Sequence, residues 1–397
     1  MATTDVRERL SQIAFKVETT PGTDAIAGTP AAGDYVTCNA TIRFNQDAAL
    51  NPVETGAYDD GVPIPGALRA EISVQVPIVG SGTAGTAPEW GKLLRAAAMI
   101  ETVTGSAVGA PTAATAGTAT TATAQTPFGT TTQQYRGMPV LLAGNPAAGA
   151  TDVIINYTTG RVATLAGGSV GATGYSPVLS VSTTLQVPIN VLYSPTSDDS
   201  LESWLTVYAW QDELRHIVTG AKATSMSIAL RDGSYAMLNM TFTGQVVSRF
   251  QNVTRPAGYA PVTRQPPLWR AGMSRLNNTL AAVASAGFDM GLRGSYLENP
   301  EAAQGYDPAI IVGRAPVVTI DPFAHSSNSP LRSGAMDAQS NWPFAAIWGS
   351  TAGNRFALSC PSGIILDMNP GSRSGMQTDQ IVLRPNLIDA GFFLACF

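Results

Sequence analysis

The sequence predicts a mainly β protein with two antiparallel β-sandwich or barrel domains, each carrying a packed helix or helix-like connection, plus a small β insertion. Three observations lead to this fold class. Several segments alternate apolar and polar residues with period two, which is typical of half-buried antiparallel strands. The 397 residues include 39 Gly and 27 Pro, many for a helical protein. The last part of the chain also repeats the motif order of the first.

The first predicted domain begins with β structure. Ile13, Phe15 and Val17 alternate with polar or small residues, and the segment 68–76 alternates in the same way over a longer run. The Asp-Gly pair at 232–233 lies between two strand-like segments and predicts a β-hairpin. This domain is expected to comprise residues 1–103 and 186–253.

One helix is predicted in the first domain. It is expected to begin near Pro88, a residue that suits a first helical turn. Trp90, Leu93, Leu94 and Ala97 then form an apolar stripe at helical spacing. We expect this stripe to pack against the apolar face of the sheet.

The remaining chain divides by composition. Residues 104–185 carry very few charges and supply short strands with turn signals, which predicts a small β insertion. Its first part, 104–124, contains only Ala, Gly, Pro, Ser, Thr and Val and is expected to be extended and solvent-facing. Residues 254–272 contain several prolines and are expected to form a linker. Residues 273–397 form the second predicted domain.

A long loop, roughly 45–66, is predicted between two strands of the first domain. Loops of this length in compact domains usually have a function or are disordered. The residues of interest in it are Asn51, Pro52, Glu54, Tyr58 and Asp59.

Composition narrows the function classes. The net charge of −5 argues against wrapping around nucleic acid, which needs clustered Lys and Arg. Charged residues make up only 13% of the chain, which favours assembly over a solitary subunit. No apolar run approaches the length of a membrane span, and the three cysteines form no disulfide framework.

Two motifs resemble enzyme signatures without their context. The sequence GSGTAG at 80–85 fits a dinucleotide fingerprint, but the predicted helix begins after it rather than within it. The pattern GGSVG at 167–171 lacks a strand-turn-helix setting, and the chain has only His216 and His325 as histidines. We therefore expect no catalytic residues, no cofactor, no metal site and no enzyme.

An internal repeat is indicated between the segments that start at Leu50 and Leu297. Both contain Asn-Pro, then Glu, then Tyr-Asp, then an Arg shortly after a Gly, then a strand. In this alignment Tyr58 corresponds to Tyr306.

The order of several motifs resembles the tail tube (major tail) proteins of long-tailed bacteriophages, of the two-domain type. These motifs are KVETTPGTDA, VPIVGSGTAGTAPEWGKLLRAAAMIETV, LYSPTSDDSLESWLTVYAWQDELRHIVTGAKATSMSIAL and MTFTGQVV. In the second domain they are IVGRAPVVTIDP, WGSTAGNRFALSCPSG and DQIVLRPN. The resemblance covers most of the chain apart from about 104–185.

The resemblance implies a structural virion protein, made in the host cytoplasm and located in the phage tail. Stacked homo-oligomeric rings would form the channel through which DNA passes from capsid to host cell. A trimer with pseudo-sixfold symmetry is preferred and a hexamer is the alternative, because two tube-like domains per chain supply two ring units. The loop 45–66 would reach a neighbouring ring, and the insertion would lie on the tube exterior.

The resemblance also implies other partners and leaves alternatives open. Expected partners are tape-measure, tail-terminator and baseplate proteins, with transient non-specific passage of DNA and no membrane span. A sheathless tail is preferred. A baseplate hub or capsid decoration protein is the first alternative, and a β-rich adhesin or binding module is the second.

Overall fold

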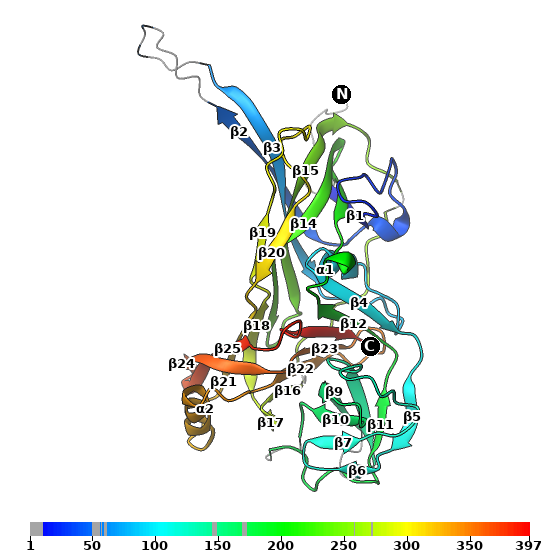
Figure 1. The fold of residues 1–397 in the computed structure, drawn as a ribbon, viewed down its shortest axis with the longest axis vertical. Helices are drawn as coiled ribbons and strands as arrows, with labels where there is room; N and C mark the ends of the chain where they lie inside the picture. Colours follow the sequence, from blue (N-terminus) through cyan, green and yellow to red (C-terminus); the bar gives the residue numbers. More distant parts are fainter. Residues whose placement is uncertain are drawn as a thin grey trace.

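A computed structural model describes residues 11–49, 56, 58, 62–144, 149–168, 173–257, 259–270 and 273–397. The fold is mainly β, with several antiparallel sheets and two short α-helices in the described part of the chain (Figure 1). This confirms the predicted fold class. The longest helix has 10 residues, so no described helix is long enough to cross a bilayer.

A ten-stranded antiparallel sheet, here called the long sheet, runs through both halves of the chain. Eight of its strands follow one another in the order β2-β3-β15-β14-β18-β21-β25-β24, and β13 joins β14 to β1. Their bounds are β1 Ser11–Val17, β2 Asn39–Ala49, β3 Ile64–Pro77, β13 Leu205–Gln211, β14 Leu214–Arg231, β15 Met237–Asn252, β18 Val283–Asp289, β21 Val317–Pro322, β24 Gly363–Arg373 and β25 Met376–Pro385.

A seven-stranded second sheet packs against the long sheet. Its order is β17-β16-β22-β23-β26-β12-β4, so it also joins strands from both halves. The bounds are β4 Met99–Thr104, β12 Asn190–Pro195, β16 Met273–Leu276, β17 Thr279–Leu280, β22 Phe344–Trp348, β23 Phe356–Cys360 and β26 Phe393–Cys396.

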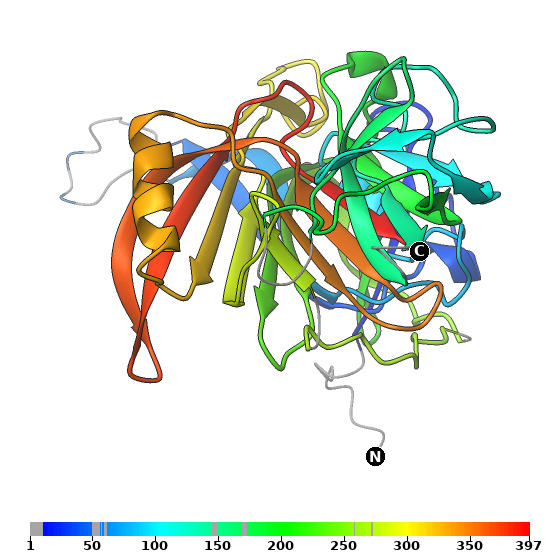
Figure 2. The ribbon, with the colours of Figure 1, turned by 90° about the horizontal axis from the view of Figure 1, so that it is seen from below.

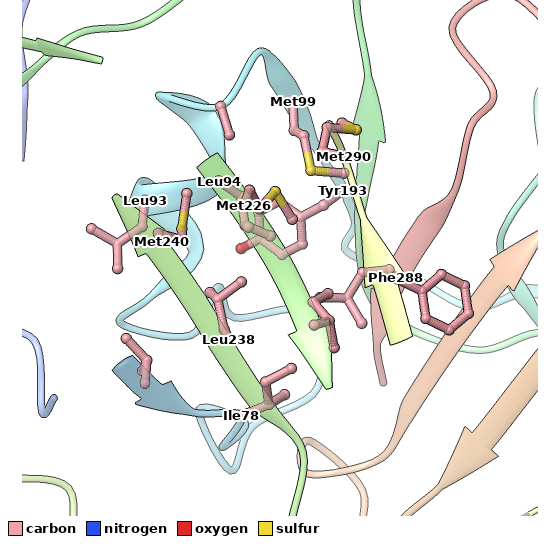
Figure 3. Packing of buried hydrophobic residues seen from close by; sticks show 14 of the residues in the cluster. Ile78, Leu93, Leu94, Met99, Tyr193, Met226, Leu238, Met240, Phe288 and Met290 are labelled. Atoms are coloured by element: carbon pink, nitrogen blue, oxygen red, sulfur yellow. The ribbon is translucent and has the colours of Figure 1, made fainter. Parts of the chain in front are cut away.

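The two sheets enclose one core that spans both halves. It includes Ile72 and Met240 of the first half and Phe288 and Leu383 of the second. Figure 3 shows Leu238 and Met240 near the helix residues Leu93 and Leu94, with Phe288 in the same cluster. The halves expected as separate domains therefore share both sheets and a core.

The insertion forms its own seven-stranded sheet with the order β5-β11-β8-β9-β10-β7-β6. It packs on the outer face of the second sheet, because Ile347, Phe393 and Phe397 belong to its core cluster. It therefore lies on the opposite side of the second sheet from the long sheet. The bounds are β5 Val108–Ala113, β6 Ala116–Gly117, β7 Thr121–Thr123, β8 Pro139–Ala143, β9 Ala150–Tyr157, β10 Val162–Leu165 and β11 Thr184–Val187.

The expectation of a solvent-facing segment at 104–124 is wrong in part. β5, β6 and β7 lie within it, and the side chains of Ala114, Ala122 and Ala124 are buried. Alternating Ala and Thr carry too little hydrophobic contrast to indicate a buried strand face by pattern alone.

The helices are short. α1 covers only Gly91–Arg95, because Ala98 has a positive φ of 55° and β4 begins at Met99. The helix thus begins later and ends earlier than predicted. α2, Asn328–Asp337, lies beside β24 and β25 (Figure 2) and is joined to β25 by the buried ion pair between Arg332 and Asp379.

The proline-rich segment 254–272 lies against the first half. Backbone N of Val262 donates to Thr37 Oγ1, and the Arg264 guanidinium donates to the carbonyl of Gly80. Trp269 is buried in the shared core. The described part of this segment is therefore packed rather than a free linker.

The long sheet contains a tandem repeat. In the first half, β2, β3, β14 and β15 follow each other in the chain but have the sheet order β2-β3-β15-β14. In the second half, β18, β21, β24 and β25 have the sheet order β18-β21-β25-β24. Because every neighbouring pair is antiparallel, corresponding strands also run in the same direction. A short helix follows the second strand of each set.

Candidate assembly surface

The two ends of the tandem repeat are sheet edges. In the described part of the chain, β2 pairs only with β3, and β24 pairs with β25 apart from one isolated bridge between Ile364 and Asn341. An unpaired strand edge presents free N–H and C=O groups that can pair with another chain. The strands that correspond to β24 and β2 in the repeat are β14 and β18. These two strands pair antiparallel inside the molecule.

The internal junction shows what such edges do when they meet. Five residue pairs join β14 to β18, from Ser227 opposite Asp289 to Arg231 opposite Ser285. Ile228 and Phe288 are opposite each other on the core side and are fully buried. The junction thus continues both the ladder and the hydrophobic core.

The exposed face of the first strand set of the long sheet carries rows of uncharged polar side chains. Across the first set, Thr41 lies opposite Ser73, and Ser73 lies opposite Thr241. In the next row, Asn39, Gln75, Asn239 and Ser227 follow one another across four strands. Arg43 and Glu71 are cross-strand neighbours of opposite charge. This face therefore offers few unbalanced positive charges.

Each half has an extended connection between its first two strands, here called its arm. The second arm, residues 290–316, connects β18 to β21 and includes β19 (Leu292–Ser295) and β20 (Ile310–Arg314). It lies against the first half (Figure 1). Tyr306 Oη donates to Asp47 at 2.7 Å and accepts from Arg69 at 2.9 Å. Backbone N of Ala309 donates to the carbonyl of Gly220, and Gln245 donates to the Tyr306 carbonyl.

The second arm covers a buried cation. Lys222 Nζ lies 2.6 Å from Glu202 and 3.9 Å from the ring centroid of Trp204. The indole N–H of Trp204 donates to the Ala309 carbonyl of the arm at 2.7 Å. Burial lowers the pKa of Lys222, while Glu202 opposes that shift.

The first arm consists of the outer parts of β2 and β3 with the described residues Gly56, Tyr58 and Val62 between them. β2 and β3 extend beyond the body of the molecule (Figure 1). Tyr58 is fully exposed, Val62 is 82% exposed and Ile64 is 58% exposed. The other loop residues singled out from the sequence, Asn51, Pro52, Glu54 and Asp59, lie outside the described residues.

The four helix residues singled out from the sequence lie together in the core. Trp90, Leu93, Leu94 and Ala97 are at most 2% exposed. The indole N–H of Trp90 donates to the carbonyl of Val79. These four side chains anchor α1 between the two sheets. They are not exposed at the β2 or β24 edge.

The glycine motif at 80–85 is a contact between the two halves. Backbone N of Gly80 donates to Asn354 Oδ1, and backbone N of Gly82 donates to the Gly353 carbonyl. A Cβ atom at Gly80 would lie 1.9 Å from that carbonyl oxygen. Glycine is therefore required here by close packing of the loop around Asn354.

The remaining candidate groups have structural surroundings. His216 is buried in β14, its Nδ1 accepts from backbone N of Phe250, and burial lowers its pKa. Burial raises the pKa of Cys360 and Cys396 to about 12. The described residues contain no group of three His, Cys, Asp or Glu side chains that could hold a metal ion.

No protein-family model matches the chain, and no curated protein matches it.

Sequence reasoning did not identify which strands form the sheet edges, and it did not identify the docked second arm. The period-two pattern identifies strands but not their neighbours, because pairing depends on the whole sheet. The alignment of Tyr58 with Tyr306 was the available signal, since it marks equivalent arms.

Proposed function

We propose that this protein is a structural subunit of a phage tail tube, in which chains join head to tail into rings that stack around a DNA channel. The observation that carries the proposal is the tandem arrangement of the long sheet, which has β2 and β24 as its end strands in the described part of the chain. The resemblance of the motif order to tail tube proteins points to the same role.

The ring follows from the direction of the repeat. β24 and β14 correspond, as do β2 and β18, so β24 of one chain offers to β2 of the next the antiparallel pairing seen inside the chain. This contact is heterologous, and such contacts form rings when the rotation between units closes. Two units per chain favour three chains in a pseudo-sixfold ring.

The exposed face of the long sheet suits a channel wall. DNA that must slide should not meet dense Lys and Arg, which hold phosphates through counterion release. Ser, Thr, Asn and Gln fill the central rows of this face. We infer that it lines the channel.

The insertion suits the outside of such a tube. It is attached to the outer face of the second sheet through Phe393 and Phe397, and the long sheet lies on the other side. With the exposed face of the long sheet turned inward, the insertion would point outward and leave the channel open.

Negative-stain electron microscopy of the purified protein across a concentration series tests this function. The proposal expects rings or stacked tubes with an open channel, with threefold class averages that show six similar lobes. Globular closed oligomers without a channel would favour another virion protein, such as a baseplate hub or capsid decoration protein.

A further inference from the structure

The second arm shows how an arm of this protein docks. It leaves the second half and lies on the preceding half, where Tyr306 is 5% exposed. The Arg69 guanidinium carbon lies 4.7 Å from the ring centroid of Tyr296 and 5.7 Å from that of Tyr306. An arm tyrosine is thus held on a strand face by an arginine and by backbone contacts near the bulge of β14.

The second half has an empty surface at the corresponding end of β24 and β25. A hollow of about 350 Å³ there is lined by Ile364, Leu366, Arg384, Pro385, Gln339 and Asn386. β24 has a bulge between Ile365 and Asp367, as β14 has between Thr219 and Lys222. Leu366 within the bulge is 59% exposed.

This hollow shares an arginine side chain with the occupied surface, although Arg384 lies on β25 and Arg69 lies on β3. Arg384 is exposed, and no hydrogen bond or ion pair of its side chain is found within the described residues. A guanidinium beside apolar side chains suits a tyrosine ring, which combines apolar contact with cation–π attraction.

The first arm carries the matching groups without a partner surface. Tyr58 corresponds to Tyr306 in the sequence repeat but is fully exposed, and Val62 and Ile64 are largely exposed as well. Three exposed apolar side chains on one extended hairpin indicate a surface that is covered in the assembly.

We propose that the first arm of one chain docks through Tyr58 onto the Leu366–Arg384 surface of the adjacent chain in the same ring. The docking resembles the contact that the second arm makes within one chain, with Arg384 of β25 in the role that Arg69 of β3 plays there. This inference rests on the proposed head-to-tail ring, but it places the arm sideways rather than on a neighbouring ring.

Cysteine cross-linking in isolated single rings tests the proposal. Val62→Cys and Leu366→Cys are combined in a Cys38→Ser background, because Cys38 is the cysteine that is only partly buried. A short bis-maleimide should then link chains into dimers and trimers on a denaturing gel. The matched control pairs Val62→Cys with Val181→Cys, which is 63% exposed on the insertion and should give no link.

A second variant keeps the test independent of the cross-linker. Tyr58→Ala should raise the concentration needed for ring formation by about tenfold, as expected for loss of one aromatic anchor. Tyr235→Ala, at a site 42% exposed, should leave it unchanged.

The outcomes separate the two proposals. Rings without the Val62–Leu366 link, or with a link that forms only in stacked tubes, overturn the sideways docking and leave the ring intact. Failure of the unmodified chain to assemble at any concentration overturns both.

Discussion

The two halves of the chain share a strand order but differ in what their edges and arms contact. Between the halves, β14 is paired with β18 and the second arm is docked against Arg69 and Gly220. At the outer ends, the described residues pair β2 on one side only, and β24 on one side apart from the bridge at Ile364. The described side chains of the first arm are exposed. The internal junction is therefore the pattern, within one chain, for the contact that we propose between chains.

The helices give the largest expected contrast between the halves. Trp90 beside α1 is 2% exposed in the shared core, whereas Leu331 of α2 is 64% exposed. Trp90→Ala should lower the free energy of unfolding by about 3–5 kcal/mol, because it leaves a cavity. Leu331→Ala should change it by less than about 0.5 kcal/mol. Urea denaturation measures both, and similar losses would contradict the different roles of the helices.

Breaking the buried ion pair between Lys222 and Glu202, under the second arm, should give the next largest loss of stability. Glu202→Gln leaves the Lys222 charge without its carboxylate and should cost about 3–5 kcal/mol. Lys222→Met combined with Glu202→Gln should recover most of that loss, because no charge remains buried. Guanidinium denaturation compares the two variants. Equal losses would mean that the charge is not what makes the single variant unstable.

The insertion adds a pH dependence of its own through Asp152. Burial raises the pKa of Asp152 to about 6 from 3.8, although Tyr175 and the backbone N–H groups of Val153 and Gly167 donate to it. Arg275 also acts to lower this pKa. Between pH 3.8 and about pH 6, the Asp152 carboxyl is protonated in the folded state and ionised in the unfolded state. The free energy of unfolding therefore falls as pH rises through this window, and the Asp152 contribution is constant above about pH 6.

The expected loss across that window is about 3 kcal/mol, from roughly two pKa units. Asp152→Asn cannot release a proton and should flatten this part of the profile. Thermal melts from pH 3.5 to 7 measure it in both proteins. An unchanged slope in the variant would show that other groups cause the dependence.

Charges on the unpaired edges should produce the smallest of these effects. Asn369 of β24 and Asn39 of β2 are exposed. Asn369→Lys with Asn39→Lys places like charges at the proposed contact and should weaken ring formation about tenfold at low salt. Asn369→Lys with Asn39→Asp should restore it. Light scattering as a function of protein concentration measures ring formation in both double variants. Equal ring formation by the two variants would contradict this edge contact.

Local pattern was sufficient for much of the strand structure. Alternation in 68–76 identified β3, and the Asp-Gly pair at 232–233 lies at the turn between β14 and β15. These features depend on residues close together in the chain. Helix length was overestimated because Ala96, Ala97 and Ala98 favour a helix, whereas the tertiary fold turns the chain into β4.

Long-range organisation could not be derived in the same way. Nothing in residues 227–231 indicates that they pair with 285–289, because any apolar-alternating edge could occupy that position. The shared core of Ile228 and Phe288 likewise joins halves that sequence spacing separates. The candidate arm was identified by its length and by Tyr58, but the surface that would receive it depends on the bulge in β24.

The most direct measurement is the cryo-electron microscopy structure of the assembled protein, at a resolution that traces strands. The account predicts three chains per ring, with β24 of each chain antiparallel to β2 of the next. The exposed polar face of the long sheet would be turned toward the channel. Rings closed through other surfaces, with β2 and β24 exposed to solvent, would contradict it.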